Sequence, residues 1–416
     1  MARIAVVGAG ISGLAAAWLL SRRHQVVLFE KESRLGGHTH THRVEIEGRP
    51  YSVDSGFIVF NPVHYPLFTR LLQELGVGSQ PSSMSFSVHE EATGFEYNAT
   101  DLPGLFARRR NLISPRFWRM LSGILRFYRE APRLLETAPL ELSLGEFLRR
   151  EGYPEPFARL HLIPMASALW SAPPEGVLDY PLRFLLRFMA NHHMLQIRGR
   201  PPWRVVQGGS SRYIEAMRTN WAVEERLGCP VKAVMRGARG VELESAAGRE
   251  VFDALVLACH SDQALSLLAD PSAQEQAILG AIPYQRNEAV LHTDARELPR
   301  RPRCHAAWNA RIPADPSAHC TVSYCMNILQ SLDAPERICV SLNRGDKIAP
   351  ERVLARMVYE HPQFTLAACA AQERREEIDG ERHTHYCGAY WGFGFHEDGL
   401  RSAVEVAARL GVSWPA

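Results

Sequence analysis

The segment Ile4-Ala5-Val6-Val7-Gly8-Ala9-Gly10-Ile11-Ser12-Gly13 opens the chain and decides its fold. Its four apolar residues predict a buried strand, and the alanine- and leucine-rich stretch after it predicts a helix. The glycines between them permit a tight turn, close approach of backbone N–H groups to a pyrophosphate, and tight packing of helix on strand. Because a helix N-terminus favours phosphate, this segment predicts an α/β fold that binds a dinucleotide.

The next segment strengthens this prediction. A second apolar strand, residues 25–29, ends at Glu30, and Lys31-Glu32-Ser33-Arg34-Leu35-Gly36-Gly37 follows it. A carboxylate at the end of that strand can accept hydrogen bonds from both hydroxyls of a ribose. A lone glycine motif is weak evidence, but a strand, a helix and an acid near the expected spacing accompany this one, so we favour a dinucleotide site over a chance turn.

Composition limits the remaining classes of protein. The chain has 416 residues, of which 46% are hydrophobic, which predicts two domains. Its net charge of +2 implies no polyelectrolyte partner such as nucleic acid. Its cysteines form no Cys-x-x-Cys pair, which favours a reduced cytosolic protein over a disulfide or zinc scaffold. The first strand leaves no room for a signal peptide and no apolar run has transmembrane length, so we expect a cytoplasmic location.

The rest of the chain predicts a nucleotide domain interrupted by a second domain. A long helical region is expected at 101–195 and a fully buried strand at 253–259, as in a parallel sheet covered on both faces. Shorter strands are expected at 86–88, 95–97, 289–292, 306–308, 320–324 and 338–342. A glycine-rich segment, 388–399, precedes a final helix that is expected to begin near Leu400.

The predicted fold class is therefore α/β, with a Rossmann-like nucleotide domain interleaved with an α+β substrate domain of mixed or antiparallel sheet and helices. The nucleotide domain is assigned to 1–75, 200–265 and 378–416. The substrate domain is assigned to 76–199 and 266–377, with the helical insert at 101–195.

Four motifs in order resemble one superfamily. The run Glu30-x-x-x-Arg34-x-Gly36-Gly37 resembles the extended fingerprint of the FAD-binding amine oxidase and phytoene desaturase superfamily, which NAD-dependent dehydrogenases lack. The segment 51–56 resembles its acid-x-glycine element, and 207–210 followed by 229–231 resembles its second nucleotide segment. The segment 397–403 resembles its final flavin motif, except that Leu400 and Ala403 replace an alanine and a glycine, which puts the packing there in doubt.

The resemblance implies that the cofactor is FAD and indicates which residues contact it. They are Gly8, Gly10, Ile11, Ser12, Gly13, Glu30, Lys31, Arg34, Gly36, Gly37, His38, Asp54, Gly56, Val231, Gly388, Asp398, Gly399 and Leu400. The segments around Trp203 and Gly392 also look like a bacterial subgroup known as predicted NAD/FAD-binding proteins. Genes of that subgroup often lie beside those for cyclopropane fatty acid synthesis, which suggests lipid acyl chemistry.

The superfamily resemblance also implies hydride transfer from a substrate C–H bond to flavin N5. Its amine oxidases usually carry a lysine near N5, but Lys31, Lys232 and Lys347 all lie outside a matching strand, which disfavours amine oxidation. We leave the catalytic residues unassigned. Flavin-facing candidates are Tyr390, Trp391 and His396. The alternative is core packing for the two aromatic residues, and a hydrogen-bonding role at a helix start for the histidine.

His38, His40 and His42 alternate along an expected strand and would therefore face one side. Alternating histidines can bind metal, but no cysteine or carboxylate cluster supports a metal site here. We therefore expect no metal, and we expect His38 to touch the cofactor while the other two face solvent. Nothing indicates a covalently attached flavin.

A basic amphipathic helix is expected from Pro115. Arginines at 108, 109, 110, 116, 119, 126, 129 and 133 accompany a single acid, Glu130, within residues 105–135. One interpretation places the apolar half of this helix on the core and its arginines in water. The other makes residues 115–133 a peripheral contact with anionic lipid. An arginine-rich face also suits nucleic acid, but no recognition motif accompanies it.

These observations favour an FAD-dependent oxidoreductase that dehydrogenates a fatty acyl or related lipid. The alternatives are a flavin amine oxidase and a non-catalytic flavin-binding subunit of a lipid-modifying complex. A separate nicotinamide domain is not expected, because no second glycine motif follows a strand. The substrate, the electron acceptor, the direction of electron flow and the oligomeric state stay open.

Overall fold

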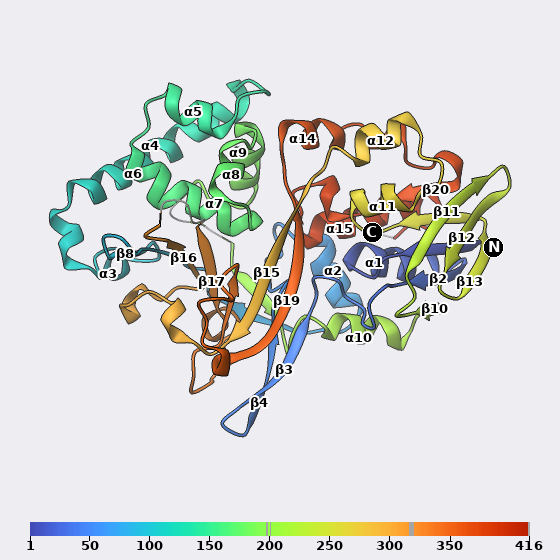
Figure 1. Ribbon diagram of the computed structural model, residues 1–416, viewed down its shortest axis with the longest axis horizontal. Coiled ribbons are helices and arrows are strands. Elements are labelled where there is room, and N and C mark those ends of the chain that lie inside the picture. The colour runs from blue at the N-terminus through green and yellow to red at the C-terminus, as the bar shows by residue number, and fades with distance from the viewer. Residues whose placement is uncertain (197–198, 200, 316–319, 415–416) are drawn as a thin grey trace.

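A parallel sheet forms the centre of one end of the molecule (Figure 1). The computed structural model describes residues 1–196, 199, 201–315 and 320–414. Within them, this sheet has five strands in the order β10-β2-β1-β14-β20. The strands are β1 (Arg3–Val7), β2 (Gln25–Phe29), β10 (Val223–Arg226), β14 (Ala254–Leu257) and β20 (Thr384–Tyr386). The strands predicted at 4–7, 25–29 and 253–259 are thereby confirmed, the last in a shorter form.

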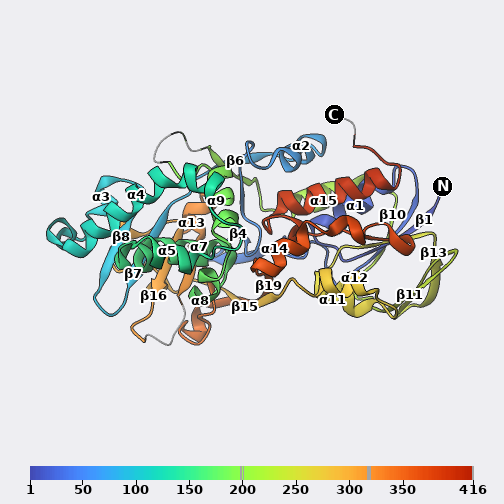
Figure 2. The ribbon, with the colours of Figure 1, turned by 90° about the horizontal axis from the view of Figure 1, so that it is seen from above.

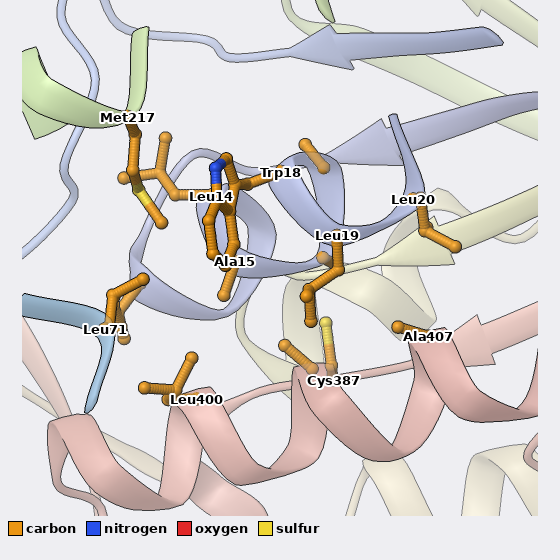
Figure 3. Close-up of a cluster of buried hydrophobic side chains, with 14 of the residues drawn as sticks. Leu14, Ala15, Trp18, Leu19, Leu20, Leu71, Met217, Cys387, Leu400 and Ala407 are labelled. Atoms are coloured by element: carbon orange, nitrogen blue, oxygen red, sulfur yellow. The ribbon is translucent and has the colours of Figure 1, made fainter. Parts of the chain in front are cut away.

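Layers cover both faces of this sheet, as the apolar character of its strands requires. Ile4 and Val6 point into one core, which contains α1 (Ile11–Leu20) and α15 (His396–Arg409). Figure 3 shows Leu19 and Leu400 between these two helices. Ala5 and Val7 point into the opposite core. That core contains the antiparallel strands β11 (Val231–Gly237), β12 (Gly240–Ser245) and β13 (Gly248–Phe252), with helices α11 (Ser261–Leu267) and α12 (Ala273–Leu279).

The second sheet has seven strands within the described residues, in the order β19-β15-β18-β17-β16-β7-β8. Its strands are β7 (Phe86–Glu90), β8 (Phe95–Asn98), β15 (Tyr284–His292), β16 (Trp308–Ile312), β17 (Thr321–Cys325), β18 (Cys339–Leu342) and β19 (Val353–Pro362). Only the β16–β7 pair among them is parallel. The predicted short strands are confirmed except at 306–308, where the strand begins only at Trp308. Ala306 and Ala307 donate instead to the side chains of Asn309 and Ser85.

Helices cover one side of this second sheet, at the end of the molecule away from the parallel sheet (Figures 1 and 2). They confirm the predicted helical region. They are α3 (Leu102–Leu105), α4 (Pro115–Thr137), α5 (Leu144–Arg150), α6 (Glu155–Phe157), α7 (Ile163–Trp170), α8 (Pro174–Leu178) and α9 (Leu182–Asn191). A π-turn, Ala158–Leu162, joins α6 to α7.

Helix α4 begins at the predicted residue, because Ser114 accepts a hydrogen bond from the Phe117 N–H (3.3 Å) and Pro115 follows it. Phe117, Met120 and Phe127 are buried in the core. The apolar half of this helix is therefore mostly used in packing, as the first of the two interpretations expects. The second interpretation, a contact with anionic lipid, then applies only to exposed residues at the start of this helix, such as Trp118.

Short elements join the two sheets. They are the hairpin β3 (Thr41–Ile46) and β4 (Arg49–Asp54), the strands β5 (Val59–Phe60), β6 (Ser79–Ser82) and β9 (Trp203–Val206), and the helices α2 (Pro66–Glu74), α10 (Arg212–Thr219), α13 (Met326–Leu329) and α14 (Leu366–Gln372). The division into domains stays a prediction. Ile278 and Leu279, which it assigns to the substrate domain, pack in a core of the parallel sheet.

The last helix corrects a prediction. Helix α15 begins at His396, before the expected start near Leu400. The Asp398 carboxylate accepts a hydrogen bond from the Phe395 N–H at 3.1 Å, which closes the first turn earlier. No helix among the described residues is long and apolar enough to cross a membrane.

Candidate cofactor site

The glycine turn after β1 has the geometry expected of a phosphate-binding loop. A β-carbon on Gly13 would lie 1.8 Å from the Gly8 carbonyl oxygen, and one on Gly8 would lie 3.0 Å from the Ala258 carbonyl group. Gly8 also has a φ of +102°, which favours glycine. At Gly10, by contrast, a β-carbon would meet nothing within 4 Å. The turn is therefore closed on its protein side and open at Gly10.

The N-terminus of α1 adjoins this open position. Helix α1 has no side-chain cap and no acidic residue in its first turn. Ile11 and Ser12 are buried, so the first turn is held firmly in the core. Uncapped N–H groups at a helix N-terminus bind anions well, because they combine hydrogen bonding with the positive end of the helix dipole. The geometry suits a pyrophosphate.

Glu30 lies where the sequence predicts, at the end of β2. Its two carboxylate oxygens accept hydrogen bonds from the N–H of Ala9 (2.7 Å) and of Glu32 (2.9 Å). A carboxylate has about four lone-pair sites, so each oxygen can still accept a hydroxyl. The neighbouring Lys31 side chain is exposed. Contact of either residue with a ribose or phosphate stays a prediction.

The glycine pair packs against the glycine turn. The Gly36 N–H donates to the Ala9 carbonyl at 2.8 Å, and a β-carbon on Gly37 would lie 3.1 Å from the Gly10 α-carbon. Arg34 donates to the carbonyl of Gly37 at 2.8 Å. The guanidinium thus fixes the loop from within, and its contact with a pyrophosphate stays a prediction.

The fully buried side chain of Asp54 links β4 to the segments that contain Ser210 and Gln330. Its carboxylate accepts from the Ser210 N–H (2.9 Å), from the Ser210 hydroxyl (2.8 Å) and from the Gln330 amide (3.0 Å). Burial raises the pKa of Asp54 to about 6, although its hydrogen bonds oppose the shift. Its neighbour Gly56 is needed for close packing, because a β-carbon there would lie 2.0 Å from the His38 carbonyl oxygen.

The predicted C-terminal contacts gather around the start of α15. A β-carbon on Gly399 would lie 2.7 Å from the Ser12 hydroxyl oxygen, so α15 approaches the phosphate end of α1. The Gly388 N–H donates to the Ser402 hydroxyl at 2.9 Å. The Leu400 side chain is buried in the core, which leaves only its backbone for a cofactor. Burial raises the pKa of Asp398, whose carboxylate caps the helix.

Val231 begins β11, close to the end of β2. The turn before it is fixed there because the Cys229 N–H donates to the Glu30 carbonyl at 2.9 Å and the Gly228 N–H donates to the Glu32 carbonyl at 2.8 Å. The second nucleotide segment thus lies next to the carboxylate proposed to bind a ribose. Its contact with the adenine stays a prediction.

The three flavin-facing candidates fall into two separate clusters. Tyr390 packs with Ile282 and Ala368, and its ring centroid lies 4.8 Å from that of Trp391. His396 lies elsewhere, stacked on Phe57 with ring centroids 3.5 Å apart.

His396 is a hydrogen-bonding residue at a helix start, as the alternative interpretation expects. It is the first residue of α15, and its Nε2 shares a 2.9 Å hydrogen bond with the Thr39 hydroxyl. Burial lowers its pKa well below the usual value, so the ring is neutral. A neutral ring that packs and hydrogen bonds in this way positions the helix start.

Only His42 of the three alternating histidines lies in a strand, which corrects the sequence expectation. Strand β3 begins only at Thr41, so His38 and His40 precede it. His40 and His42 are half-buried, where the sequence expectation has them facing solvent. Their ring centroids lie 3.9 Å apart, and they hydrogen bond to Tyr359 (3.2 Å) and Ser55 (2.8 Å) respectively.

His38 belongs to a half-buried group of three imidazoles that sequence reasoning missed. Its ring centroid lies 5.2 Å from that of His361 and 6.4 Å from that of His260. We call these three residues the imidazole cluster. Burial lowers the pKa of His38 to about 4, with a contribution from His260, so the ring is neutral at ordinary pH. Only the tertiary fold unites them, because they come from the glycine-pair loop, the end of β14 and β19.

Asn287 of β15 completes this polar region. Its amide nitrogen lies 3.0 Å from His361 Nδ1, and its amide oxygen accepts from Asn343 at 2.7 Å. Burial lowers the pKa of His361 to about 3. The described residues contain no group of three or more histidine, cysteine, aspartate or glutamate side chains that could hold a metal ion.

The residues present fit FAD. The open position at Gly10 and the uncapped α1 provide space and N–H groups for its pyrophosphate. His38 Nε2 and the Tyr390 hydroxyl are buried and lack a hydrogen-bond partner among the described residues. Both atoms are thus free to hydrogen bond to a bound group.

Comparison with known proteins places the chain among flavoenzymes. A sequence model of the family described as flavin containing amine oxidoreductase matches residues 11–299. A protein of Mycobacterium tuberculosis that is named as a flavin-containing monoamine oxidase is 26% identical over 277 residues, or 64% of this chain and 59% of that protein. A carotenoid phi-ring synthase of Streptomyces griseus is 27% identical over 283 residues, or 64% of this chain and 54% of that protein. The chain thus spans less than two thirds of these curated relatives.

Solved structures share the fold over nearly the whole chain. A CLA-producing fatty acid isomerase from P. acnes matches with a TM-score of 0.69 at 16% identity, covering 98% of each chain. Cyclohexylamine oxidase from Brevibacterium oxydans IH-35A matches with a TM-score of 0.67 at 17% identity, covering 99% of each chain. At such identities the likeness shows the fold alone.

Proposed function

We propose a fatty acyl or related lipid as the substrate of this chain, which belongs to the flavin containing amine oxidoreductase family. The family is flavin-containing, so the cofactor is FAD and the chain is an FAD-dependent oxidoreductase. The reaction we propose is dehydrogenation of a carbon–carbon bond, in which a hydride and a proton leave neighbouring carbons.

The observation that carries this proposal is the position of the lysines. Lys31, Lys232 and Lys347 are the only lysines in the chain, and all three side chains are exposed. None lies in the interior between the two sheets, where the amine oxidases of this superfamily are expected to hold one. The chain therefore lacks the interior lysine that the amine oxidases of this superfamily usually carry, which disfavours amine oxidation.

The chain's own residues have three tasks in this reaction. The α1 N-terminus and Glu30 bind the cofactor, which when bound supplies the acceptor for the hydride. The half-buried imidazole cluster lines the space beside the glycine pair. His38, neutral and with an unpartnered Nε2, can hydrogen bond to a group bound beside the glycine pair and orient it.

One relative supports a hydrophobic substrate, because it is named as a carotenoid phi-ring synthase. A solved structure that shares the fold is named as a fatty acid isomerase. Other relatives are named as oxidases of amines, which favours amine oxidation as the second candidate. A non-catalytic flavin subunit is the third candidate, since the sequence assigns no catalytic acid or base.

Product analysis tests the proposal. Holoprotein is incubated in air with a phospholipid of saturated acyl chains, and separately with primary amines, and the products are identified by mass spectrometry. We expect a lipid with one additional carbon–carbon double bond and no aldehyde from the amines. Aldehyde formation alone would establish amine oxidation, and no product from either would favour the non-catalytic subunit.

A further inference from the structure

An arginine-lined pocket lies at the β8 end of the seven-stranded sheet, outside the cofactor site. Its volume is about 680 Å³. It is lined by Gly94, Ala107, Arg108, Arg109, Arg110, Arg300 and Arg301. These residues come from the β7–β8 turn, from the segment that leads into the 3₁₀ turn Arg109–Ile113, and from the segment that precedes β16. Two separate segments, 108–110 and 300–301, thus bring five guanidinium groups to one place.

Most of the positive charge in this pocket is uncompensated. Arg301 lies 2.8 Å from Glu96, whose carboxylate is buried. Arg108 donates to the Thr93 carbonyl at 3.0 Å, and burial together with the charges of Arg301 and Arg110 lowers its pKa. Arg109, Arg110 and Arg300 form no ion pair with any described residue. A cluster of like charges on a solvent-facing pocket favours an anion.

Exposed apolar side chains stand beside the pocket. Ile113, at the end of the same 3₁₀ turn, is 84% exposed, and Leu112 is 51% exposed. Trp118, on the first turns of α4, is 49% exposed and donates its indole N–H to the Leu112 carbonyl at 2.9 Å. Adjacent large apolar residues are seldom left in water without a role. Tryptophan with arginine at one surface is typical of the interface between lipid headgroups and acyl chains.

We propose that this surface docks on a bilayer that contains anionic phospholipid, with the headgroup phosphate in the arginine pocket. Leu112, Ile113 and Trp118 then enter the boundary between headgroups and acyl chains. The partner is chosen by complementarity, since uncompensated arginines and exposed apolar residues match a phosphate above a hydrocarbon layer. The inference deepens the proposed function and rests on it, because a lipid substrate resides in such a bilayer.

The membrane contact proposed here lies at a different place from the one considered for residues 115–133 in the sequence. The apolar half of 115–133 packs on the core, so that helix cannot insert as a whole. The docking surface instead comprises the pocket and the residues at the start of α4. It lies at the end of the molecule opposite the parallel sheet (Figures 1 and 2).

Vesicle binding tests this proposal with a matched control. Holoprotein is sedimented with vesicles of phosphatidylcholine alone and of phosphatidylcholine mixed with phosphatidylglycerol. The test variant is Arg109→Ala with Arg110→Ala. The control is Arg129→Ala with Arg133→Ala, which removes the same charge from the far half of α4. A third variant, Ile113→Ser, removes apolar contact without changing charge.

We expect binding only to the phosphatidylglycerol vesicles. Loss of two arginines should weaken partitioning roughly 30-fold, at about 1 kcal/mol for each arginine near an anionic surface. Ile113→Ser should also weaken binding, and the control should bind within a few-fold of the unaltered protein. Equal loss in the control, or no loss in the test variant, overturns the proposal.

Inorganic phosphate separates a lipid site from a site for a free anion. If phosphate protects the pocket arginines from chemical modification and the protein binds no vesicles, the docking proposal is overturned and the pocket binds a soluble anion. Flavin content and flavin reduction are measured separately from vesicle binding. The arginine variants should retain bound flavin and its reduction by detergent-dissolved lipid, so failure of docking and failure of the proposed reaction give different results.

Discussion

Gly399 of α15 lies so close to Ser12 of α1 that a β-carbon on Gly399 would come within 2.7 Å of the Ser12 hydroxyl oxygen. The same β-carbon would lie 2.9 Å from a methyl carbon of Ile11. The first turns of two helices from opposite ends of the chain are thereby packed together. The phosphate end of α1 is thus held rigidly by a C-terminal segment.

This contact predicts that Gly399→Ala destabilises the fold. The added methyl group must displace Ile11 or Ser12 in a well-packed core, which costs about 1–3 kcal/mol. Urea denaturation of the apoprotein measures the free energy of unfolding. An unchanged midpoint would show that the two helices are not in contact.

Gly10→Ala is expected to act differently. A β-carbon there meets nothing within 4 Å, so the apoprotein should unfold at the same urea concentration as the unaltered protein. The methyl group would occupy the space open to a pyrophosphate, so the purified variant should carry little flavin. Visible absorbance per polypeptide measures this. Full flavin content in Gly10→Ala would place the pyrophosphate elsewhere.

Asp54 predicts a specific pH dependence of stability. Its pKa rises from 3.8 in the unfolded chain to about 6 in the folded protein. A raised carboxyl pKa gives a stabilising contribution that is complete below pH 3.8 and is lost as the pH rises through about 6. The free energy of unfolding of the unaltered protein, minus that of Asp54→Asn, should therefore fall by about 3 kcal/mol over this range. A difference that is constant with pH would contradict the raised pKa.

His38 predicts a dependence of the opposite sign. Its pKa falls from 6.5 in the unfolded chain to about 4 in the folded protein, so its contribution is complete above pH 6.5 and is lost as the pH falls towards 4. Relative to His38→Gln, the unaltered apoprotein should lose about 3 kcal/mol across that interval. Unfolding in urea at a series of pH values tests this, and a gain on acidification would show that His38 is charged and paired.

Contacts between neighbours in the sequence were predictable. The glycine turn, β2 with Glu30, and the start of α4 at Pro115 each depend on local patterns of apolar residues, glycine and capping side chains. The start of α15 was wrong by one turn, because the carboxylate of Asp398 caps the helix at Phe395 and glycine-rich sequence hid that signal.

Contacts between distant segments were not predictable. The imidazole cluster joins His38, His260 and His361, and no local pattern marks the last two as partners of the first. The arginine pocket likewise needs Arg300 and Arg301 to meet Arg108, which only the strand order of the second sheet brings about. The Asp54 junction with Ser210 and Gln330 is of the same kind.

Anaerobic absorbance titration of the purified holoprotein tests the central claim most directly. Bound FAD should be bleached on addition of a lipid with saturated acyl chains, and amines at equal concentration should leave the spectrum unchanged. The Arg109→Ala and Arg110→Ala variant in detergent should behave as the unaltered protein does. Bleaching by amines but not by lipid, or a colourless protein that binds no added FAD, would contradict the account.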